Sequence, residues 1–320
     1  MIFISCSNKD DIKTGKLNPS IGSRNHVTIV IDDDLWNGEV GDSIRKKLAQ
    51  AYLGLVKDEP IFDLDQYSPS IFSSKAKMGR NIISFSNDED YAFTLEKSFY
   101  ATPQNFFFVR AKSNNELIQN FNNHADSIIS VFRNSELNEE QHYLVRKPLL
   151  NTEIVKNDFA CTIKIPATFD LVLDDDNFLW FQKDLVTGNS NLIIYEIPIS
   201  KIENNLNDIE SNLIKAQDSI SKEYVLGTNE NSYMITENSF FPSFKTIQIQ
   251  ELHGYQISGT WDMENDFMNG PFLTIALRDD YFDRYLIFQA FVNNPFKNTR
   301  DLLFEMEAIM KTVNFYDNEN

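Results

Sequence analysis

The sequence predicts an α+β protein with two domains, each a mainly antiparallel sheet with packed helices. The chain has 320 residues, which is enough for two cores of ordinary size. It contains 26 Phe and 12 Tyr, which can bury large areas although the mean hydropathy is −0.35. Strand and helix patterns follow one another without the regular strand–helix–strand rhythm of a parallel sheet. We expect a leading segment over residues 1–20, a first domain over 21–148 and a second over 152–316.

The first domain is expected to open with a buried strand, because residues 26–31 are rich in β-branched side chains. A helix follows over residues 41–53, where Ile44 and Leu48 fall on one face. A longer helix is expected over 114–133, whose apolar residues recur at helical spacing. The remaining expected elements are strands over 81–85 and 105–109 and a short helix over 137–145.

The second domain is expected to be richer in strands. Residues 254–262 alternate between two sets of side chains, as a strand with two distinct faces does. Asn269-Gly270 is a strong turn signal before the next strand. Two helices, over 205–222 and 299–313, place apolar residues inward. The other expected strands cover 162–166, 178–181, 192–195, 272–277 and 284–292.

The charge of the chain limits its partners. The formal net charge is −18, and no basic run is longer than residues 45–47. A polyanion would be repelled by such a field, so we expect no nucleic-acid partner. Anionic lipid headgroups would be repelled in the same way, and the sequence has no apolar stretch long enough to span a bilayer. Any attachment to a membrane therefore has to be covalent.

The start of the chain indicates such an anchor. Residues 1–4 are apolar, Ser5 is small, and the residues after Cys6 turn abruptly polar and acidic. This is the pattern of a signal peptide that ends at a lipidated cysteine, here shortened by a misplaced start codon or a trimmed sequence. Residues 7–19 are then a flexible spacer. The alternative is a native first strand with Cys6 as an ordinary residue.

The spacer also bears on location. Residues 7–11 resemble the lysine-plus-acidic tract that directs some lipoproteins to the outer face of the outer membrane. Periplasmic and surface-exposed locations both remain open.

No motif predicts a catalytic residue, a metal or a cofactor. The sequence lacks a phosphate-binding loop, a dinucleotide fingerprint, a nucleophile elbow and a zinc-protease motif. The four histidines are expected to be surface or capping residues, and Cys161 is expected to be a buried strand residue. The histidines are His26, His124, His142 and His253.

Two acidic triplets, Asp32–Asp34 and Asp174–Asp176, each follow an expected strand. Loop carboxylates of this kind bind Ca²⁺ or act as an acid and base pair. In a calcium loop starting at Asp33, Leu35 and Ile44 would occupy ligand positions, so the spacing fails. We interpret both triplets as solvated turns or charges at a helix start.

The most distinctive internal stretch is 261–272, where two Met, two Phe and a Trp stand beside three carboxylates. Such a loop can bury aromatic side chains in a partner. The candidate partner-binding residues are Trp261, Asp262, Phe267 and Met268. The alternative is a hairpin whose aromatic side chains cover the end of its own sheet.

Five segments resemble, in their order, an uncharacterised family of Gram-negative envelope proteins called domain of unknown function 4837. They are residues 34–42, 59–64, 178–180, 232–234 and 259–272. The resemblance covers residues 21–315 and implies a full signal peptide that ends in a lipobox cysteine. The family has no established activity, so the resemblance implies no catalytic residue. In element order, residues 160–315 also resemble the α/β/α sandwich of the PsbP and Mog1 proteins, which implies protein binding.

These observations favour an envelope lipoprotein that is held at a membrane through Cys6 and binds or scaffolds another envelope protein. One alternative is a lipid-anchored hydrolase or carbohydrate-acting enzyme that uses carboxylates of the acidic triplets. Another is a small-ligand binder with an aromatic-lined cleft between the domains.

Overall fold

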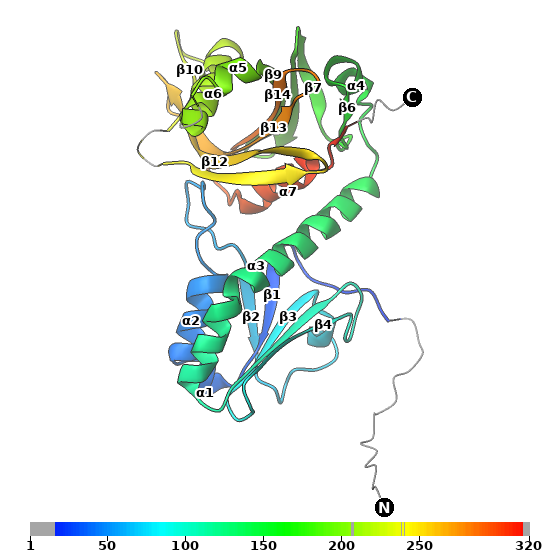
Figure 1. The fold of residues 1–320 in the computed structure, drawn as a ribbon, viewed down its shortest axis with the longest axis vertical. Coiled ribbons are helices and arrows are strands. Elements are labelled where there is room, and N and C mark those ends of the chain that lie inside the picture. Colours follow the sequence, from blue (N-terminus) through cyan, green and yellow to red (C-terminus); the bar gives the residue numbers. More distant parts are fainter. Residues whose placement is uncertain (1–16, 206–207, 238, 240, 316–320) are drawn as a thin grey trace, which may run out of the picture. The chain divides into compact units, whose positions relative to one another are not determined.

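The structure is a computed structural model that describes residues 17–205, 208–237, 239 and 241–315. The chain divides into two compact units (Figure 1). The first comprises the residues up to Leu48 together with Phe62–Phe132. The second comprises Ala49–Ile61 and the chain from Arg133 onward. The segment Ala49–Ile61, called the arm below, therefore belongs to the second unit although it lies within the sequence of the first.

The first unit contains a five-stranded sheet in the order β2-β1-β3-β5-β4. Three of its four strand pairings are parallel, and only β4 and β5 pair as an antiparallel hairpin. The α+β class is confirmed, but the expectation of a mainly antiparallel sheet is wrong for this unit. The strands are β1 (His26–Val30), β2 (Asp63–Tyr67), β3 (Asn81–Ser86), β4 (Ala92–Lys97) and β5 (Asn105–Arg110).

The parallel pairing follows from the path of the chain between strands. Helices α1 (Asp33–Trp36) and α2 (Glu39–Leu48) and then the arm separate β1 from β2. Such a long crossover returns the chain to the end of the sheet at which the previous strand began, so the next strand runs in the same direction. The arm interrupts the regular alternation of strand and helix that would have indicated a parallel sheet.

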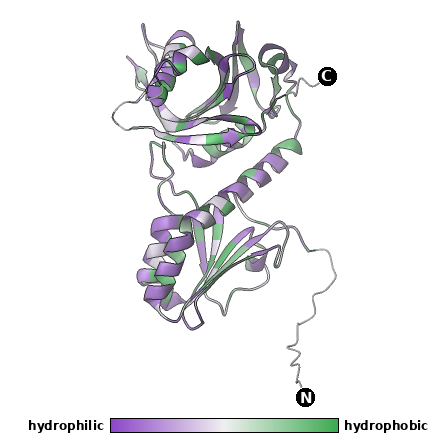
Figure 2. Cartoon of the chain, viewed as in Figure 1, coloured by the Kyte–Doolittle hydropathy of each residue, from purple (hydrophilic) through white to green (hydrophobic). Residues whose placement is uncertain are grey.

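Helix α3 (Asn114–Val145) is continuous where the sequence predicts two helices over 114–133 and 137–145. Its apolar stripe, from Leu117 to Phe132, is buried as expected. In the first unit this stripe packs on aromatic side chains: the rings of Phe132 and Phe107 lie 5.4 Å apart. Helix α2 lies beside α3, and mostly hydrophilic residues cover the outer surface of the pair (Figure 2).

The second unit contains an antiparallel sheet in the order β10-β12-β13-β14-β9-β8-β7, and β11 pairs with another part of β12. The strands are β7 (Asp170–Asp175), β8 (Phe178–Leu185), β9 (Gly188–Pro198), β10 (Tyr233–Thr236), β11 (Ser243–Ile249), β12 (Leu252–Glu264), β13 (Asn269–Asp279) and β14 (Arg284–Asn293). Two short strands, β6 (Cys161–Thr162) and β15 (Asn314–Phe315), form a separate pair.

Helices cover both faces of this sheet. Nearly every residue of β13 and β14 is buried, which requires cover on each side. Helix α6 (Ile209–Tyr224) packs on one face through Leu213, and α7 (Arg300–Met310) packs on β13 and β14. The remaining helices are α4 (Glu153–Phe159) and α5 (Ile199–Ile202). Among the described residues, no helix has the length and apolarity needed to cross a membrane.

Glu59 fixes the arm on the second unit. Its carboxylate, which is buried, accepts hydrogen bonds from the backbone N–H groups of Thr299 (2.7 Å) and Arg300 (3.2 Å). These N–H groups open helix α7, where a helix has unsatisfied donors and a positive dipole end. The Arg300 guanidinium also donates to the carbonyl oxygen of Pro60 at 3.0 Å. The arm therefore supplies the cap that α7 does not supply itself.

Candidate functional site

The arm and the edge of the second sheet enclose a cleft of about 680 Å³, called the arm cleft below. It forms where β12 changes neighbours. Strand β11 pairs with β12 from Leu252 to Ser258, and β10 pairs with it from Trp261 to Glu264. Gly259 and Thr260 lie between these two pairings, and Glu237, Phe241 and Ser243 line the cleft beside them.

Two glycines allow the arm to approach this gap. Gly54 adopts φ +87°, and a Cβ atom there would lie 2.8 Å from the backbone nitrogen of Gly259. A Cβ on Gly259 would in turn lie 2.9 Å from the ring of Phe272. Any larger residue at either position would be forced into its neighbours, because contacts this short lie inside van der Waals separation. The two backbones therefore meet directly and close one wall of the cleft.

The side chains around the cleft are unusually apolar for a solvent-facing surface. Leu53, Val56 and Phe241 are 64%, 52% and 99% exposed. Exposed apolar groups gathered around a concavity indicate a binding surface rather than a random scatter. Asp58 and Glu237 line the same cleft and add acidic groups. This combination suits a ligand that has both apolar and basic groups.

The four predicted partner-binding residues do not form one exposed patch. Trp261 is only 3% exposed, and its indole N–H donates to the carbonyl oxygen of Val292 at 3.3 Å. Met268 is half-buried against the same core. Asp262 is half-buried and accepts the backbone N–H of the next residue at 2.8 Å. Phe267, in the turn between β12 and β13, is fully exposed.

The predicted lipidation residue, Cys6, lies outside the described residues. Cys161 is buried as expected and forms no disulfide. Burial raises the pKa of its thiol to about 12, so the thiol stays protonated near neutral pH.

The acidic triplets lie in different units. The first opens helix α1, which matches the expected charge at a helix start. The second spans the end of β7 and the turn to β8, and the hydroxyl of Tyr224 donates to Asp175 there at 3.2 Å. Burial, together with the charges of Asp174 and Asp176, raises the pKa of Asp158. No cluster of three or more His, Cys, Asp or Glu side chains in the described part of the chain could hold a metal ion.

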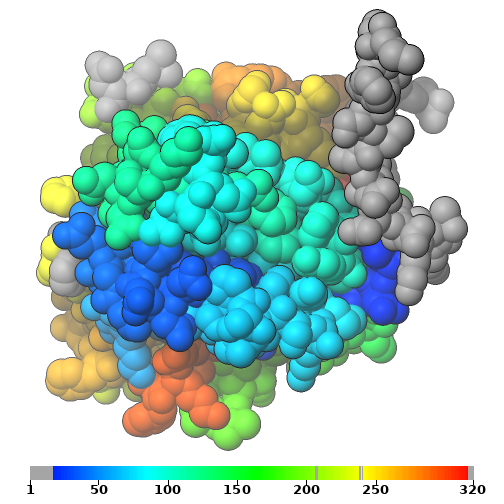
Figure 3. Space-filling model, turned by 90° about the horizontal axis from the view of Figure 1, so that it is seen from below, coloured from blue at the N-terminus to red at the C-terminus, as the bar shows by residue number. Residues whose placement is uncertain are grey.

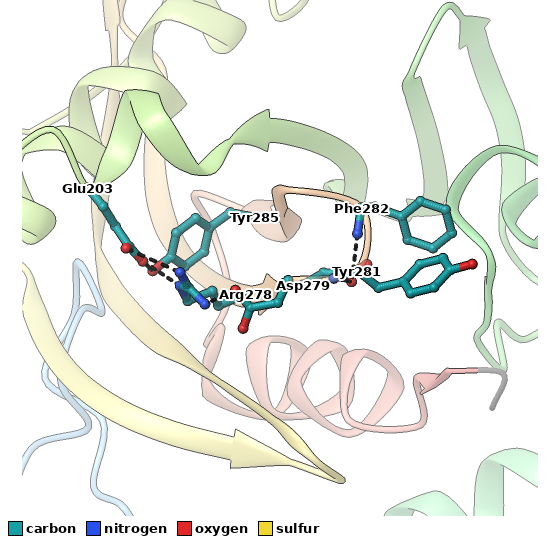
Figure 4. A network of polar contacts seen from close by, with 7 residues as sticks. Glu203, Arg278, Asp279, Tyr281, Phe282 and Tyr285 are labelled. Atoms are coloured by element: carbon teal, nitrogen blue, oxygen red, sulfur yellow. Dashed lines mark hydrogen bonds and ion pairs between the residues drawn. The ribbon is translucent and has the colours of Figure 1, made fainter. Parts of the chain in front are cut away.

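A second exposed aromatic group, which was not predicted from the sequence, lies at the tip of the β13–β14 hairpin (Figure 4). Tyr281 and Phe282 are exposed there, with their rings packed edge to face at 4.7 Å. The carboxylate of Asp279 accepts the backbone N–H groups of both residues, at 3.2 and 3.4 Å, and also pairs with Arg284. The signal was present in the sequence as two adjacent aromatic residues between aspartates.

The base of this hairpin is fixed by Glu203. Its carboxylate accepts hydrogen bonds from Arg278 and from the hydroxyl of Tyr285, both at 2.7 Å (Figure 4). The hydrogen bond from Arg278 is the main reason that the pKa of Glu203 lies below its ordinary value. A carboxylate held by two donors stiffens the strands that carry the exposed tip.

Two family models match the chain. One, described as domain of unknown function (DUF8532), matches residues 20–145. The other, described as domain of unknown function (DUF4837), matches residues 148–312, which are 165 of the 320 residues. The chain belongs to the DUF4837 family. The arm lies in the DUF8532 match and Gly259 in the DUF4837 match, so both matched regions contribute to the arm cleft of this DUF4837 protein.

Solved structures of Mog1 show a distant likeness to this DUF4837 chain. The Ran-binding protein Mog1p of Saccharomyces cerevisiae is 11% identical with a TM-score of 0.34, over 49% of this chain and 91% of Mog1p. A mutant of the protein Mog1 is 10% identical with a TM-score of 0.32, over 50% of this chain and 92% of that chain. The loose resemblance to Mog1 inferred from element order is thus found again. No curated protein matches the chain.

Proposed function

We propose that this DUF4837 protein is a partner-binding protein that holds a short segment of another protein in the arm cleft. The observation that carries the proposal is the exposure of Leu53, Val56 and Phe241 around a concave surface. Apolar anchors that enter such a pocket supply most of the affinity of a typical interface. Because the backbones at Gly54 and Gly259 are in direct contact, this wall of the cleft is already formed before a partner binds. A preformed cleft lowers the entropic cost of binding.

The partner segment is expected to be apolar and basic. Asp58 and Glu237 lie at the cleft, and the whole chain carries a net charge of −18. Complementary charge raises the rate of encounter and disfavours acidic competitors. Lys or Arg side chains next to aliphatic or aromatic anchors fit both features of the cleft.

Peptide binding tests this proposal. The probes are fluorescent eight-residue peptides that combine aromatic and aliphatic residues with Lys or Arg, and a matched set has Glu in place of the basic residues. Fluorescence anisotropy with the full chain is expected to detect binding of the basic set only. Phe241→Ser should weaken it by about tenfold or more, as the loss of an interface anchor does.

Phe267→Ser is the matched control. It removes a phenylalanine that is also fully exposed in the second unit but does not line the cleft. Peptide affinity is expected to be unchanged in this variant. If Phe267→Ser weakens binding and Phe241→Ser does not, the turn between β12 and β13 is the binding surface and the arm cleft is not.

The proposal includes a membrane anchor at Cys6. The apolar residues, the small Ser5 and the abrupt change to polar residues after Cys6 support lipidation. A lipid on this residue, followed by the spacer of residues 7–19, would hold the partner-binding unit near a cell-envelope membrane. The partner is then another protein of the envelope.

A further inference from the structure

We propose that the first unit contains a binding site for a small molecule that carries a phosphate group. The site is a cleft of about 570 Å³ beside the edge strand β2. One wall is the connection between β2 and β3, and another is the start of the described chain. Figure 3 shows these segments on one surface, the first described residues in dark blue beside the connection in cyan.

The wall formed by the β2–β3 connection is fixed in advance. The side-chain amide of Gln104, itself buried, donates to the carbonyl oxygens of Lys77 (2.8 Å) and Gly79 (2.6 Å). From the other side, the backbone N–H of Ile21 donates to the carbonyl oxygen of Met78 at 2.9 Å. A loop held at three consecutive residues keeps the groups it carries in place, which favours ligand binding.

The charged groups of the cleft differ from those of the rest of the molecule. Lys75 and Arg80 line it, and the one carboxylate among its described lining residues, that of Asp65, is paired with His26 at 3.1 Å. Lys75 makes no ion pair with any residue that the structure describes. In a chain with a net charge of −18, the described residues that line this cleft thus include two cations and one carboxylate, and Arg80 also donates to the carbonyl oxygen of Ser23 at 3.3 Å. Such a site attracts an anion.

The uncharged side chains that line the cleft indicate which class of anion it binds. Hydroxyl groups line the cleft together with the two cations, and a hydroxyl can donate to an anionic oxygen. Several donors that come from different segments of the chain suit the three terminal oxygens of a phosphate better than the two oxygens of a planar carboxylate. The hydroxyl-bearing lining residues are Ser23, Thr28, Tyr67, Ser73 and Ser74.

Titration of the full chain with inorganic phosphate and with glycerol 3-phosphate, at constant ionic strength, tests the proposal. Isothermal calorimetry or amide shifts in NMR spectra are expected to show saturable binding. Lys75→Ala should weaken the binding by about tenfold, the usual effect of losing one charge-assisted contact. Because Lys75 is an exposed residue, its loss is not expected to disturb folding.

Lys112→Ala is the control for charge alone. Lys112 is also in the first unit, is exposed and pairs with Asp90 at 2.6 Å, but it does not line the cleft. If Lys75→Ala and Lys112→Ala weaken phosphate binding equally, the effect is one of general charge and the proposal is overturned. The proposal is also overturned if neither inorganic phosphate nor glycerol 3-phosphate binds saturably.

Vesicles that contain phosphatidic acid distinguish a lipid headgroup from a free phosphate. We expect no capture of the chain on these vesicles, because the net charge of −18 opposes approach to an anionic surface. Capture on the vesicles, combined with no response to the free phosphates, would contradict a small-molecule site.

Discussion

At the scale of single residues, the second unit depends on a carboxylate buried among cations. Glu307 on α7 is 1% exposed and lies 2.6 Å from Arg133 and 2.8 Å from Lys311. Burial by itself raises the pKa of Glu307, but the charges of Arg133, Lys311 and Lys245 outweigh it and hold the pKa below its ordinary value. The hydroxyl of Tyr52 in the arm lies 3.5 Å from the same carboxylate, and burial raises its pKa to about 12.

Glu307→Gln should destabilise the second unit by about 3 kcal/mol at neutral pH, because buried cations lose their counter-charge. The pKa of Glu307 is lower in the folded protein than in the unfolded chain. Its contribution is therefore complete above the ordinary glutamate pKa and is lost as pH falls through the lowered folded value. Urea unfolding at several pH values measures both effects.

The control for this prediction is Glu210→Gln, which changes an exposed glutamate on α6. It should leave stability unchanged. The prediction fails if Glu307→Gln is as stable as the wild type at neutral pH. It also fails if the variant loses as much stability on acidification as the wild type does.

The sequence predicts the apolar partners of α7 but not this charge cluster. Leu303, Met306 and Ile309 are buried as their helical spacing requires. Arg133 is 174 positions from Glu307, and no local pattern relates the two. Pairs of this kind depend on the path of the whole chain. The same reason explains why Phe241 could not be assigned to a cleft that the arm completes.

At the scale of elements, the hydrophobic periodicity of the sequence predicted the positions of single helices and strands. It did not predict the path of the chain between them. The expected strand over 254–262 is found as Leu252–Glu264, and the expected helix over 299–313 as Arg300–Met310. The break expected near residue 134 is absent: the backbone of α3 continues through this stretch, where Asn134 is exposed and Glu136 is buried. The arm has no helical or strand period, and its partners lie far away in sequence: Glu59 and Thr299 are 240 positions apart.

The arm gives a test at this scale. Gly54→Ala should destabilise the second unit by about 2 kcal/mol, from backbone strain at positive φ and from the clash with Gly259. Peptide affinity for the arm cleft should fall as well, because the arm must move away. Urea unfolding and the anisotropy assay measure the two losses.

Gly22→Ala is the control that distinguishes backbone strain at positive φ from the steric clash of an added Cβ atom. Gly22 also has a positive φ, +141°, but a Cβ there would meet nothing within 4 Å. This variant should lose less stability than Gly54→Ala and should keep its peptide affinity. Equal loss of stability in both variants would show that close contact between the arm and β12 is unimportant.

At the scale of the whole molecule, the compact units and the family matches divide the chain differently. The two matches meet between residues 145 and 148, whereas the second unit begins at Arg133 and includes the arm. A fragment that starts after the first match would lack Glu59 and so the cap of α7. The amino-acid composition predicts neither the arm's place in the second unit nor this cap, although it does give the net charge of −18.

The acidic net charge also makes the proposed membrane anchor testable. With a net charge of −18, the chain should be repelled by anionic headgroups unless a lipid holds it. The chain placed behind a complete lipoprotein signal sequence should therefore sediment with membranes and resist a high-salt wash. Cys6→Ala should move it to the soluble fraction, because no acyl chain can be attached.

Cys161→Ala is the matched control, since Cys161 is buried and cannot accept a lipid in the folded protein. This variant should remain with the membranes. If Cys6→Ala also remains there after the salt wash, lipidation does not hold the protein. If salt releases it, the attachment is electrostatic and must come from a basic partner rather than from the bilayer, because screening weakens only contacts between charges.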